Sequence, residues 1–340
     1  MRQVLLSCVL TSLHERIDGD AGSAIGEVGV DLPHYIRRTF GAVETGRSVM
    51  RLTVGIATVG RPEILAETLR ELTGQSRRPN TVIVCGVEDE DLGGAEQAYP
   101  GVQLLVEACP GLPRQRNRLI EAASSADVIV FFDDDFLPHL DYLREVERQM
   151  SADPRIVVAT GRVLADGITG SGLTPEMART ILARYRASSH SGIQPAFTGY
   201  GCNFAVRLSP VRQNNILFDT RLPLYAWQED VDFSRRMAKY GRIVKVEAAS
   251  GVHLGVKSGR SSGVRLGYSQ VANPLYLSRK RLGYPFTRAL THIACNVGMN
   301  LVRFIRPEAH VDRRGRLRGN ALALLDLISG RITPERMLDL

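Results

Sequence analysis

Short runs of consecutive apolar residues alternate along the chain with longer stretches in which apolar residues recur every third or fourth position. Residues 52–58, 81–87 and 128–132 are runs of the first kind, rich in β-branched residues and short enough for buried strands. Residues 62–72, between the first two runs, show the helical spacing. Strands that alternate with helices predict βαβ units, and hence an α/β fold in which a mostly parallel sheet is flanked by helices.

The same patterns divide the chain into three parts. Residues 50–255 continue the alternation and are expected to form one α/β domain. Residues 1–49 show no sustained apolar period, so we expect an N-terminal extension outside this fold. Residues 256–340 are expected to form a helical C-terminal extension. Further strands are expected at residues 102–106, 156–160, 201–206 and 243–248, and further helices at residues 114–123, 140–150, 174–185 and 230–240.

The C-terminal extension is basic and contains an amphipathic pattern. Helices are expected at residues 266–281 and 285–305, and the polar residues of the second recur every three or four positions, leaving its opposite face apolar. These polar residues are Arg288, His292, Asn296, Asn300 and Arg303. Residues 257–318 contain thirteen Lys and Arg residues against two acidic residues, a local net charge of +11. Two interpretations stay open: a helix packed on the parent domain, or a helix on an anionic membrane surface.

Composition narrows the class of protein. The chain of 340 residues is 44% hydrophobic and 23% charged, which excludes wholesale disorder. No apolar run reaches the ~18 residues that a membrane span requires. Five scattered cysteines without a Cys-x-x-Cys pair argue against a disulfide framework or a zinc site. We therefore expect a cytoplasmic protein, peripheral on the inner face of the cell membrane if its basic extension binds that surface.

Three consecutive aspartates, Asp133, Asp134 and Asp135, directly follow the apolar run at residues 128–132. Like charges this close repel one another in a folded chain unless something compensates them. A divalent cation such as Mg²⁺ or Mn²⁺ would do so, because hard ions prefer carboxylate oxygens, and ligands bind at the carboxyl ends of strands in open α/β sheets. The alternative is a solvated acidic turn that caps a helix from about residue 138.

Four further features fall at chain positions that could meet these aspartates. A basic helix start contains Arg116, a strand rich in small residues follows Gly199, an acidic helix start follows Trp227, and His253 follows a strand. Arginines at a helix start suit an anionic ligand, and a neutral imidazole is a common metal ligand. Each feature alone is more often structural, as a solvated basic face, a helix cap or a buried histidine.

Taken together and in this order, these features resemble the family 2 glycosyltransferases of the GT-A fold. The matching elements are Gln75 before Pro79, Arg116-Asn117, Asp133 with Asp135, Glu229-Asp230 and then His253. The resemblance implies a metal-dependent enzyme of the hexosyltransferase type, which transfers a sugar with inversion from a nucleotide-diphosphate-sugar to an acceptor hydroxyl. It also implies a setting in bacterial polysaccharide or glycolipid synthesis.

The resemblance assigns a role to each candidate residue. Asp135, with Asp133 and His253, would bind the Mn²⁺ or Mg²⁺ that bridges the donor phosphates. Asp230 would be the catalytic base, with the adjacent Glu229 as its rival. The donor site would contain Thr58, Arg61, Arg116, Asp133 and Asp134, and Trp227 would bind the acceptor, a glycan or a lipid-linked saccharide.

The end of the second strand departs from the family pattern. The family usually shows an aspartate pair there, where the nucleobase is bound, whereas in this chain the acids begin only beyond the strand, at Glu88 and Asp89. A UDP-sugar is the first expected donor, and GDP and dTDP stay open.

Two alternatives belong to other classes of protein. A nucleotidyltransferase shares strand-end aspartates, but it requires a Gly-rich basic loop after the first strand, and the loop from Thr58 to Pro62 is a poor version of that loop. A nucleic-acid-binding protein would explain the basic extension, but the tyrosines and phenylalanines there are too widely spaced for base stacking. We therefore expect no nucleic-acid partner.

Overall fold

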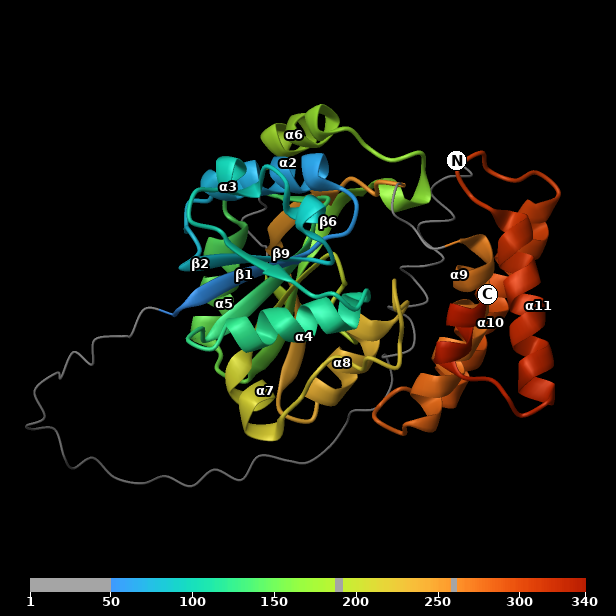
Figure 1. Cartoon of the computed structure of the whole chain (residues 1–340). Helices are drawn as coiled ribbons and strands as arrows, with labels where there is room; N and C mark the ends of the chain where they lie inside the picture. Colours follow the sequence, from blue (N-terminus) through green and yellow to red (C-terminus); the bar gives the residue numbers. More distant parts are fainter. Residues whose placement is uncertain (1–49, 187–191, 258–261) are drawn as a thin grey trace, which may run out of the picture. The chain divides into compact units, whose positions relative to one another are not determined.

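The computed structural model describes residues 50–186, 192–257 and 262–340 (Figure 1). The predicted N-terminal extension, residues 1–49, lies outside the described residues. In the described part, nine strands form one sheet in the order β3-β2-β1-β4-β8-β6-β9-β5, and β7 also pairs with β9. The strands are β1 (Leu52–Ala57), β2 (Thr81–Gly86), β3 (Gln103–Val106), β4 (Val128–Asp133), β5 (Phe136–Pro138), β6 (Ile156–Asp166), β7 (Ile193–Pro195), β8 (Asn203–Arg207) and β9 (Arg242–His253).

Helices cover this sheet, as expected for an α/β fold (Figure 1). Before the C-terminal extension they are α2 (Pro62–Thr73), α3 (Ala95–Ala98), α4 (Leu112–Ala122), α5 (Tyr142–Ala152), α6 (Pro175–Arg184), α7 (Leu208–Asn214) and α8 (Glu229–Met237), with short 3-10 helices η1 (Asp89–Leu92) and η2 (Gly167–Thr169). In the extension they are α9 (Gly263–Arg279), α10 (Phe286–Phe304), α11 (Arg313–Ile328) and the 3-10 helix η3 (Pro334–Asp339).

The first four strands are connected as the apolar pattern predicts. β1 pairs in parallel with β2 and β4, and β2 pairs in parallel with β3. Beyond β4 the sheet is mixed, because β8 runs antiparallel to both β4 and β6, while β6 and β9 are parallel. The predicted α/β class, with a mostly parallel sheet flanked by helices and a helical extension, is confirmed.

The central strand β4 is buried on both faces. Phe132 packs in the core that contains Leu65 of α2, whereas Phe131 packs in the core that contains Leu119 of α4. These side chains are at most 1% exposed. Burying an aliphatic or aromatic side chain of this size stabilises the fold by about 1.5–3 kcal/mol. The rigid strand therefore fixes the position of the aspartates that follow it.

The segment after these aspartates is a short strand, and the helix that we expected from about residue 138 begins at Tyr142. β5 pairs antiparallel with β9 and sets Phe136 opposite His253. Asp134 and Asp135 are buried. The alternative of a solvated acidic turn is therefore wrong.

The C-terminal extension packs through small residues. A Cβ atom added at Gly267 of α9 would lie 2.1 Å from the carbonyl oxygen of Arg316, and one added at Gly319 of α11 would lie 2.1 Å from that of Val264. The two helix backbones therefore touch directly, and only glycine fits at the crossing. No described helix combines the length and the hydropathy needed to cross a membrane.

Candidate active site

The candidate site lies where β4 ends. Asp133 is the last residue of β4, beside the last residue of β1 in the parallel register, and its backbone N–H donates to the carbonyl of Cys202 at 3.1 Å. The carboxyl ends of the parallel strands meet at this edge of the sheet, which is where ligands bind in open α/β folds.

Asp133, Asp135 and His253 form a candidate metal centre. One ligand atom from each side chain can be chosen so that all three lie within 4.8 Å of one another. Two carboxylate oxygens and an imidazole nitrogen suit a divalent cation such as Mn²⁺, and Asp133 is open enough to admit one, with its side chain 32% exposed. The donor set therefore fits the predicted cation.

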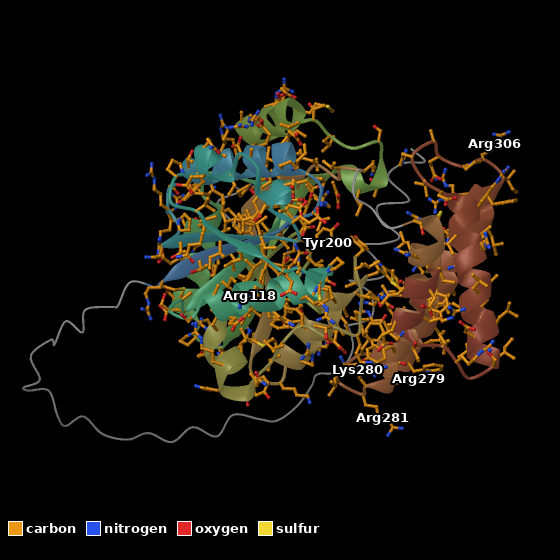
Figure 2. All side chains as sticks on the ribbon, in the orientation of Figure 1. Arg118, Tyr200, Arg279, Lys280, Arg281 and Arg306 are labelled. Carbon is orange, nitrogen blue, oxygen red and sulfur yellow. The ribbon has the colours of Figure 1, made fainter. Side chains whose placement is uncertain are left out.

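Asp166, at the end of β6, orients His253 and was not predicted from the sequence. The Nδ1 atom of His253 lies 2.9 Å from Asp166 Oδ1, and Nε2 lies 3.2 Å from Asp135 Oδ1. The hydroxyl of Tyr200, labelled in Figure 2, donates to the other oxygen of Asp166 at 2.7 Å. Burial lowers the pKa of His253, but its hydrogen bonds to Asp135 and Asp166 outweigh burial and raise it to about 10. A carboxylate that binds Nδ1 directs Nε2 toward the metal centre.

The predicted donor residues Thr58, Arg61 and Asp134 lie together. The Thr58 hydroxyl donates to Asp134 Oδ2 at 2.8 Å, and an Arg61 nitrogen lies 2.8 Å from Asp134 Oδ1. Burial raises the pKa of Asp134 to about 7 against the lowering effect of Arg61. The Asp134 carboxylate is fully buried. Through its contacts with Thr58 and Arg61 it holds the loop after β1 in place. Donor binding by these three residues stays a prediction.

Arg116 is a buried link between the aspartates and helix α8. Its guanidinium donates to Glu229 Oε1, to Asp133 Oδ1 at 3.1 Å and to the carbonyl of Gly201 at 2.6 Å. Burial opposes its charge, but Glu229 and Asp133 keep the pKa of Arg116 raised. The guanidinium also lies 5.2–5.6 Å from the ring centroids of Phe131, Phe204 and Phe218. Arg116 therefore holds Asp133, Gly201 and Glu229 in position from the buried side of the site. Contact between Arg116 and a nucleotide stays a prediction.

Glu229 and Asp230 point to different partners at the start of α8. Glu229 is buried against Arg116; burial raises the pKa of Glu229, and the charge of Arg116 opposes that rise. Asp230 is half-buried and accepts the N–H groups of Gly201 and Val231, both at 2.8 Å. Burial also raises the pKa of Asp230. Gly201 thus contacts both Arg116 and Asp230, and it joins the metal centre to the predicted base.

The loop before α8 presents Trp227 with a strained backbone. Three alternate non-glycine residues have left-handed φ angles, a conformation that is costly and frequent at functional sites. They are Leu224 at 54°, Ala226 at 51° and Gln228 at 73°. The carbonyl of Trp227 accepts a hydrogen bond at 2.8 Å from Asn273 of α9. Helix α9 therefore supports this loop, and acceptor binding by Trp227 stays a prediction.

The acidic residues after β2 differ in exposure. Glu88 and Asp89 are exposed, whereas Asp91 is buried. The Asp91 carboxylate accepts the N–H of Gly60 at 2.6 Å and that of Val87 at 2.9 Å. Asp91 therefore ties the loop after β1 to the loop after β2, a role that the sequence did not reveal.

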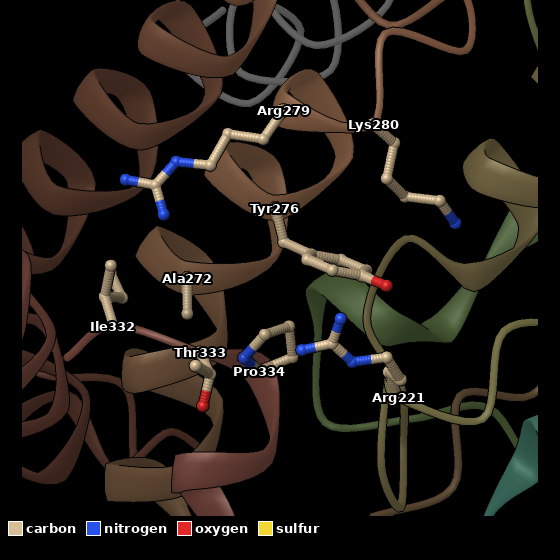
Figure 3. A pocket seen from close by; sticks show the side chains of 8 residues that line it. All are labelled: Arg221, Ala272, Tyr276, Arg279, Lys280, Ile332, Thr333 and Pro334. Atoms are coloured by element: carbon tan, nitrogen blue, oxygen red, sulfur yellow. The ribbon is translucent and has the colours of Figure 1, made fainter. Parts of the chain in front are cut away.

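A separate cavity of about 340 Å³ lies beside α9 (Figure 3). It is lined by Arg221, Ala272, Tyr276, Arg279, Lys280, Ile332, Thr333 and Pro334. Lys280 is paired with Asp219 at 2.7 Å and with Asp232 at 2.5 Å. None of the candidate catalytic, donor or metal residues lines this cavity.

Several solved structures have folds similar to that of this chain. The mannosyltransferase PcManGT from Pyrobaculum calidifontis, in complex with GDP-Man and Mn²⁺, is 16% identical, with 86% of this chain and 79% of that chain covered and a TM-score of 0.49. TarS 1–349 from S. aureus is 14% identical, with 85% and 91% covered and a TM-score of 0.49. GalNAc-T7 with UDP, GalNAc and Mn²⁺ is 14% identical, with 74% and 58% covered and a TM-score of 0.50. At such identities the likeness concerns the fold alone.

A family model matches most of the central domain. No curated protein sequence matches the chain. The model described as glycosyl transferase family 2 matches residues 53–213, the part that runs from β1 through Arg116 and the three aspartates into α7. The resemblance to the family 2 glycosyltransferases is therefore confirmed over residues 53–213.

Proposed function

We propose that the protein is an inverting glycosyltransferase that moves a hexose from a nucleotide-diphosphate-sugar to an acceptor hydroxyl. The observation that carries this proposal is the position of two carboxylate groups with different surroundings. Asp133 and Asp135 lie with His253 in a cation-binding set, while Asp230 stands apart from it beyond Gly201. Transfer in one displacement needs these two roles: charge stabilisation at the leaving diphosphate and a base at the attacking hydroxyl.

Asp133, Asp135 and His253 would hold Mn²⁺ or Mg²⁺ in this enzyme. A bound cation would supply neutralising charge for a leaving nucleoside diphosphate. The Asp166 carboxylate would keep Nε2 of His253 directed toward the centre. GalNAc-T7, which shares the fold, was solved with UDP and Mn²⁺, and this agrees with a UDP-sugar as the first donor to test.

Asp230 is the better candidate for the catalytic base, and Glu229 is the candidate for positioning Arg116. Each Asp230 oxygen accepts one backbone N–H, which leaves a free lone pair for an acceptor hydroxyl. Glu229 is occupied by Arg116 and buried. A base that activates the acceptor on the face opposite the leaving group produces inversion at the anomeric carbon.

The acceptor class and the cellular setting belong to the same proposal. We infer a glycan or a lipid-linked saccharide as acceptor, in bacterial polysaccharide or glycolipid synthesis. A cytoplasmic location fits the four described cysteines, which are all unpaired.

A screen of UDP-, GDP- and dTDP-sugars, with and without Mn²⁺, tests the function. Release of nucleoside diphosphate should require one donor and the cation, and NMR of the early product should show the opposite anomeric configuration to the donor. A product that retains the configuration would exclude the single displacement. Full activity in excess chelator would exclude the metal role.

A further inference from the structure

Helix α10 turns its polar residues toward the protein interior. Asn300 donates to Gln270 of α9 at 2.9 Å and to Asn320 of α11 at 2.9 Å. Asn296 lies 3.1 Å from the amide nitrogen of Gln270. Asn300 is fully buried. Polar residues that the sequence pattern placed on one face of α10 therefore form hydrogen bonds with α9 and α11 inside the C-terminal extension.

The opposite face of α10 is apolar and faces outward. This α10 apolar face consists of Phe286, Leu290, Leu301, Val302 and Ile305, the last directly after the helix. Val302 is 70% exposed and Ile305 is 82% exposed. A helix on a water-facing surface normally has the reverse arrangement. An exposed apolar face of this kind marks a contact with a partner or a membrane.

Basic residues stand at both ends of this face. Arg279 and Arg281 precede α10, and Arg306, Arg314 and Arg318 follow it, all of them exposed. Figure 2 labels Arg279 and Arg281 near one end of α10 and Arg306 near the other. Helix α10 itself contains no acidic residue.

One contact joins the arginines to apolar residues of α10. The Arg314 guanidinium lies 6.0 Å from the ring centroid of Phe304, itself 47% exposed. Helix α11 adds apolar exposure, because Leu325 is 61% exposed and Ile328 is 85% exposed. Both helices therefore expose apolar side chains, and arginines lie at the ends of the α10 apolar face.

Charge favours one occupant over the others. A second copy in a symmetric dimer would set the same patch against itself and bring arginines at both margins together, which is repulsive. An anionic leaflet offers hydrocarbon for the α10 apolar face and phosphate groups for the arginines. Helix α10 has 19 residues and is about 28 Å long, so its apolar face could lie along the membrane surface.

We propose that the α10 apolar face docks on an anionic lipid leaflet, with Arg306 and Arg314 at the headgroups. The full chain should sediment with vesicles of phosphatidylcholine and phosphatidylglycerol. It should sediment much less with pure phosphatidylcholine, and high salt should release it, because salt screens the arginines.

Two double variants separate the apolar and the electrostatic contributions to vesicle binding. V302S/I305S removes two side chains that would be buried in lipid, so partitioning should fall roughly 100-fold or more. R306Q/R314Q should weaken it about 25-fold, at about fivefold for each arginine. Leu140→Ser and Arg148→Gln change exposed residues of the catalytic domain in the same way and should leave binding unchanged. Circular dichroism checks that every variant is folded.

Several outcomes would overturn the proposal. Equal binding to neutral and anionic vesicles would exclude an electrostatic contribution from the arginines. Unchanged binding of V302S/I305S would show that a surface other than the α10 apolar face binds the vesicles. A dimer in sedimentation velocity that V302S/I305S converts to a monomer, without vesicle binding, would make a second copy the occupant. A monomer that binds neither kind of vesicle would also refute docking.

Discussion

Two adjacent acids at the start of α8 have different surroundings, and this difference assigns their roles. Asp230 is half-buried and bound by backbone N–H groups, whereas Glu229 is buried against Arg116. A positioned base contributes typically ~10²–10⁴ in rate. We expect Asp230→Asn to lower kcat by that order while donor binding stays nearly unchanged, because the base touches the acceptor. Steady-state kinetics and donor titration of the same preparation measure the two effects.

Glu229→Gln is the matched comparison for this prediction. It keeps a hydrogen-bond acceptor for Arg116 but removes the charge, so we expect it to disturb the position of Asp133 as well as turnover. If Asp230→Asn kept near-normal kcat while Glu229→Gln lost it with donor affinity intact, the base would be Glu229.

Arg116 should matter for stability as well as for the site. Arg116→Met leaves the buried Glu229 without its charge partner and removes a cation beside Asp133. Breaking a buried ion pair costs about 3–5 kcal/mol. Arg118, two residues along α4, has a side chain that is 46% exposed, so Arg118→Met should change the free energy of unfolding by less than about 0.5 kcal/mol. Urea unfolding of both variants should reveal this difference in the loss of unfolding free energy. Equal losses in Arg116→Met and Arg118→Met would contradict the structural role of Arg116.

At the scale of elements, the pairing of β5 with β9 connects the aspartates to His253. Gly251 of β9 makes this pairing possible, because a Cβ there would lie 2.2 Å from the Phe136 ring. We expect Gly251→Ala to destabilise the fold by about 1–3 kcal/mol, as overpacking does, and to weaken Mn²⁺ binding by displacing His253. Calorimetric titration and thermal unfolding measure the two effects.

Gly298 of α10 is the matched control for this substitution. An added Cβ meets nothing within 4 Å there, so Gly298→Ala should stabilise the protein by about 0.5–1 kcal/mol. Unchanged Mn²⁺ affinity in Gly251→Ala would mean that the β5–β9 pairing does not position His253.

The connection between α10 and α11 should give the extension a pH dependence. Glu308 accepts two hydrogen bonds from Arg313, both at 2.9 Å, and these lower its pKa from 4.5 to about 2. A carboxyl with a lower pKa in the folded state contributes stability above its unfolded pKa and loses it as pH falls. The stability difference between wild type and Glu308→Gln should therefore shrink between pH 4.5 and about 2. Urea unfolding across that range measures it, and a constant difference would contradict the ion pair.

Elements with a strong apolar period were predictable, and elements stabilised by other means were not. β1, β2 and β4 are continuous apolar runs, and each was predicted within about a residue of its observed bounds. β5 and β7 have three residues each, too few to show a period. Helix α11 buries Gly319, Asn320, Ala323 and Asp326, so its packed face carries no apolar signal.

At the scale of the whole molecule, the assembly of the site follows partly from topology. Asp133 and Asp135 were predictable because aspartates at a strand end face the ligand edge of an open sheet. His253 comes from the distant strand β9 and was found through the order of motifs. Asp166 was not predictable, since it meets His253 through a β6–β9 register that is shifted by irregularities between Gly161 and Arg162 and further along. The burial of Asp134 and Arg116 likewise depends on packing that the sequence alone does not display.

Cation binding should also appear in the stability of the whole molecule, independently of catalysis. A ligand that binds only the folded state stabilises it by about 2.7 kcal/mol at 100 times its Kd, so Mn²⁺ should raise Tm by several degrees. Asp135→Asn removes an anionic ligand from the set of Asp133, Asp135 and His253 and should abolish most of this shift. Asp339→Asn, at a side chain that is 68% exposed, should keep the full shift. Differential scanning calorimetry measures these changes without a donor or an acceptor. An undiminished shift in Asp135→Asn would move the cation to another site, and no shift in wild type would contradict a metal centre built by these residues.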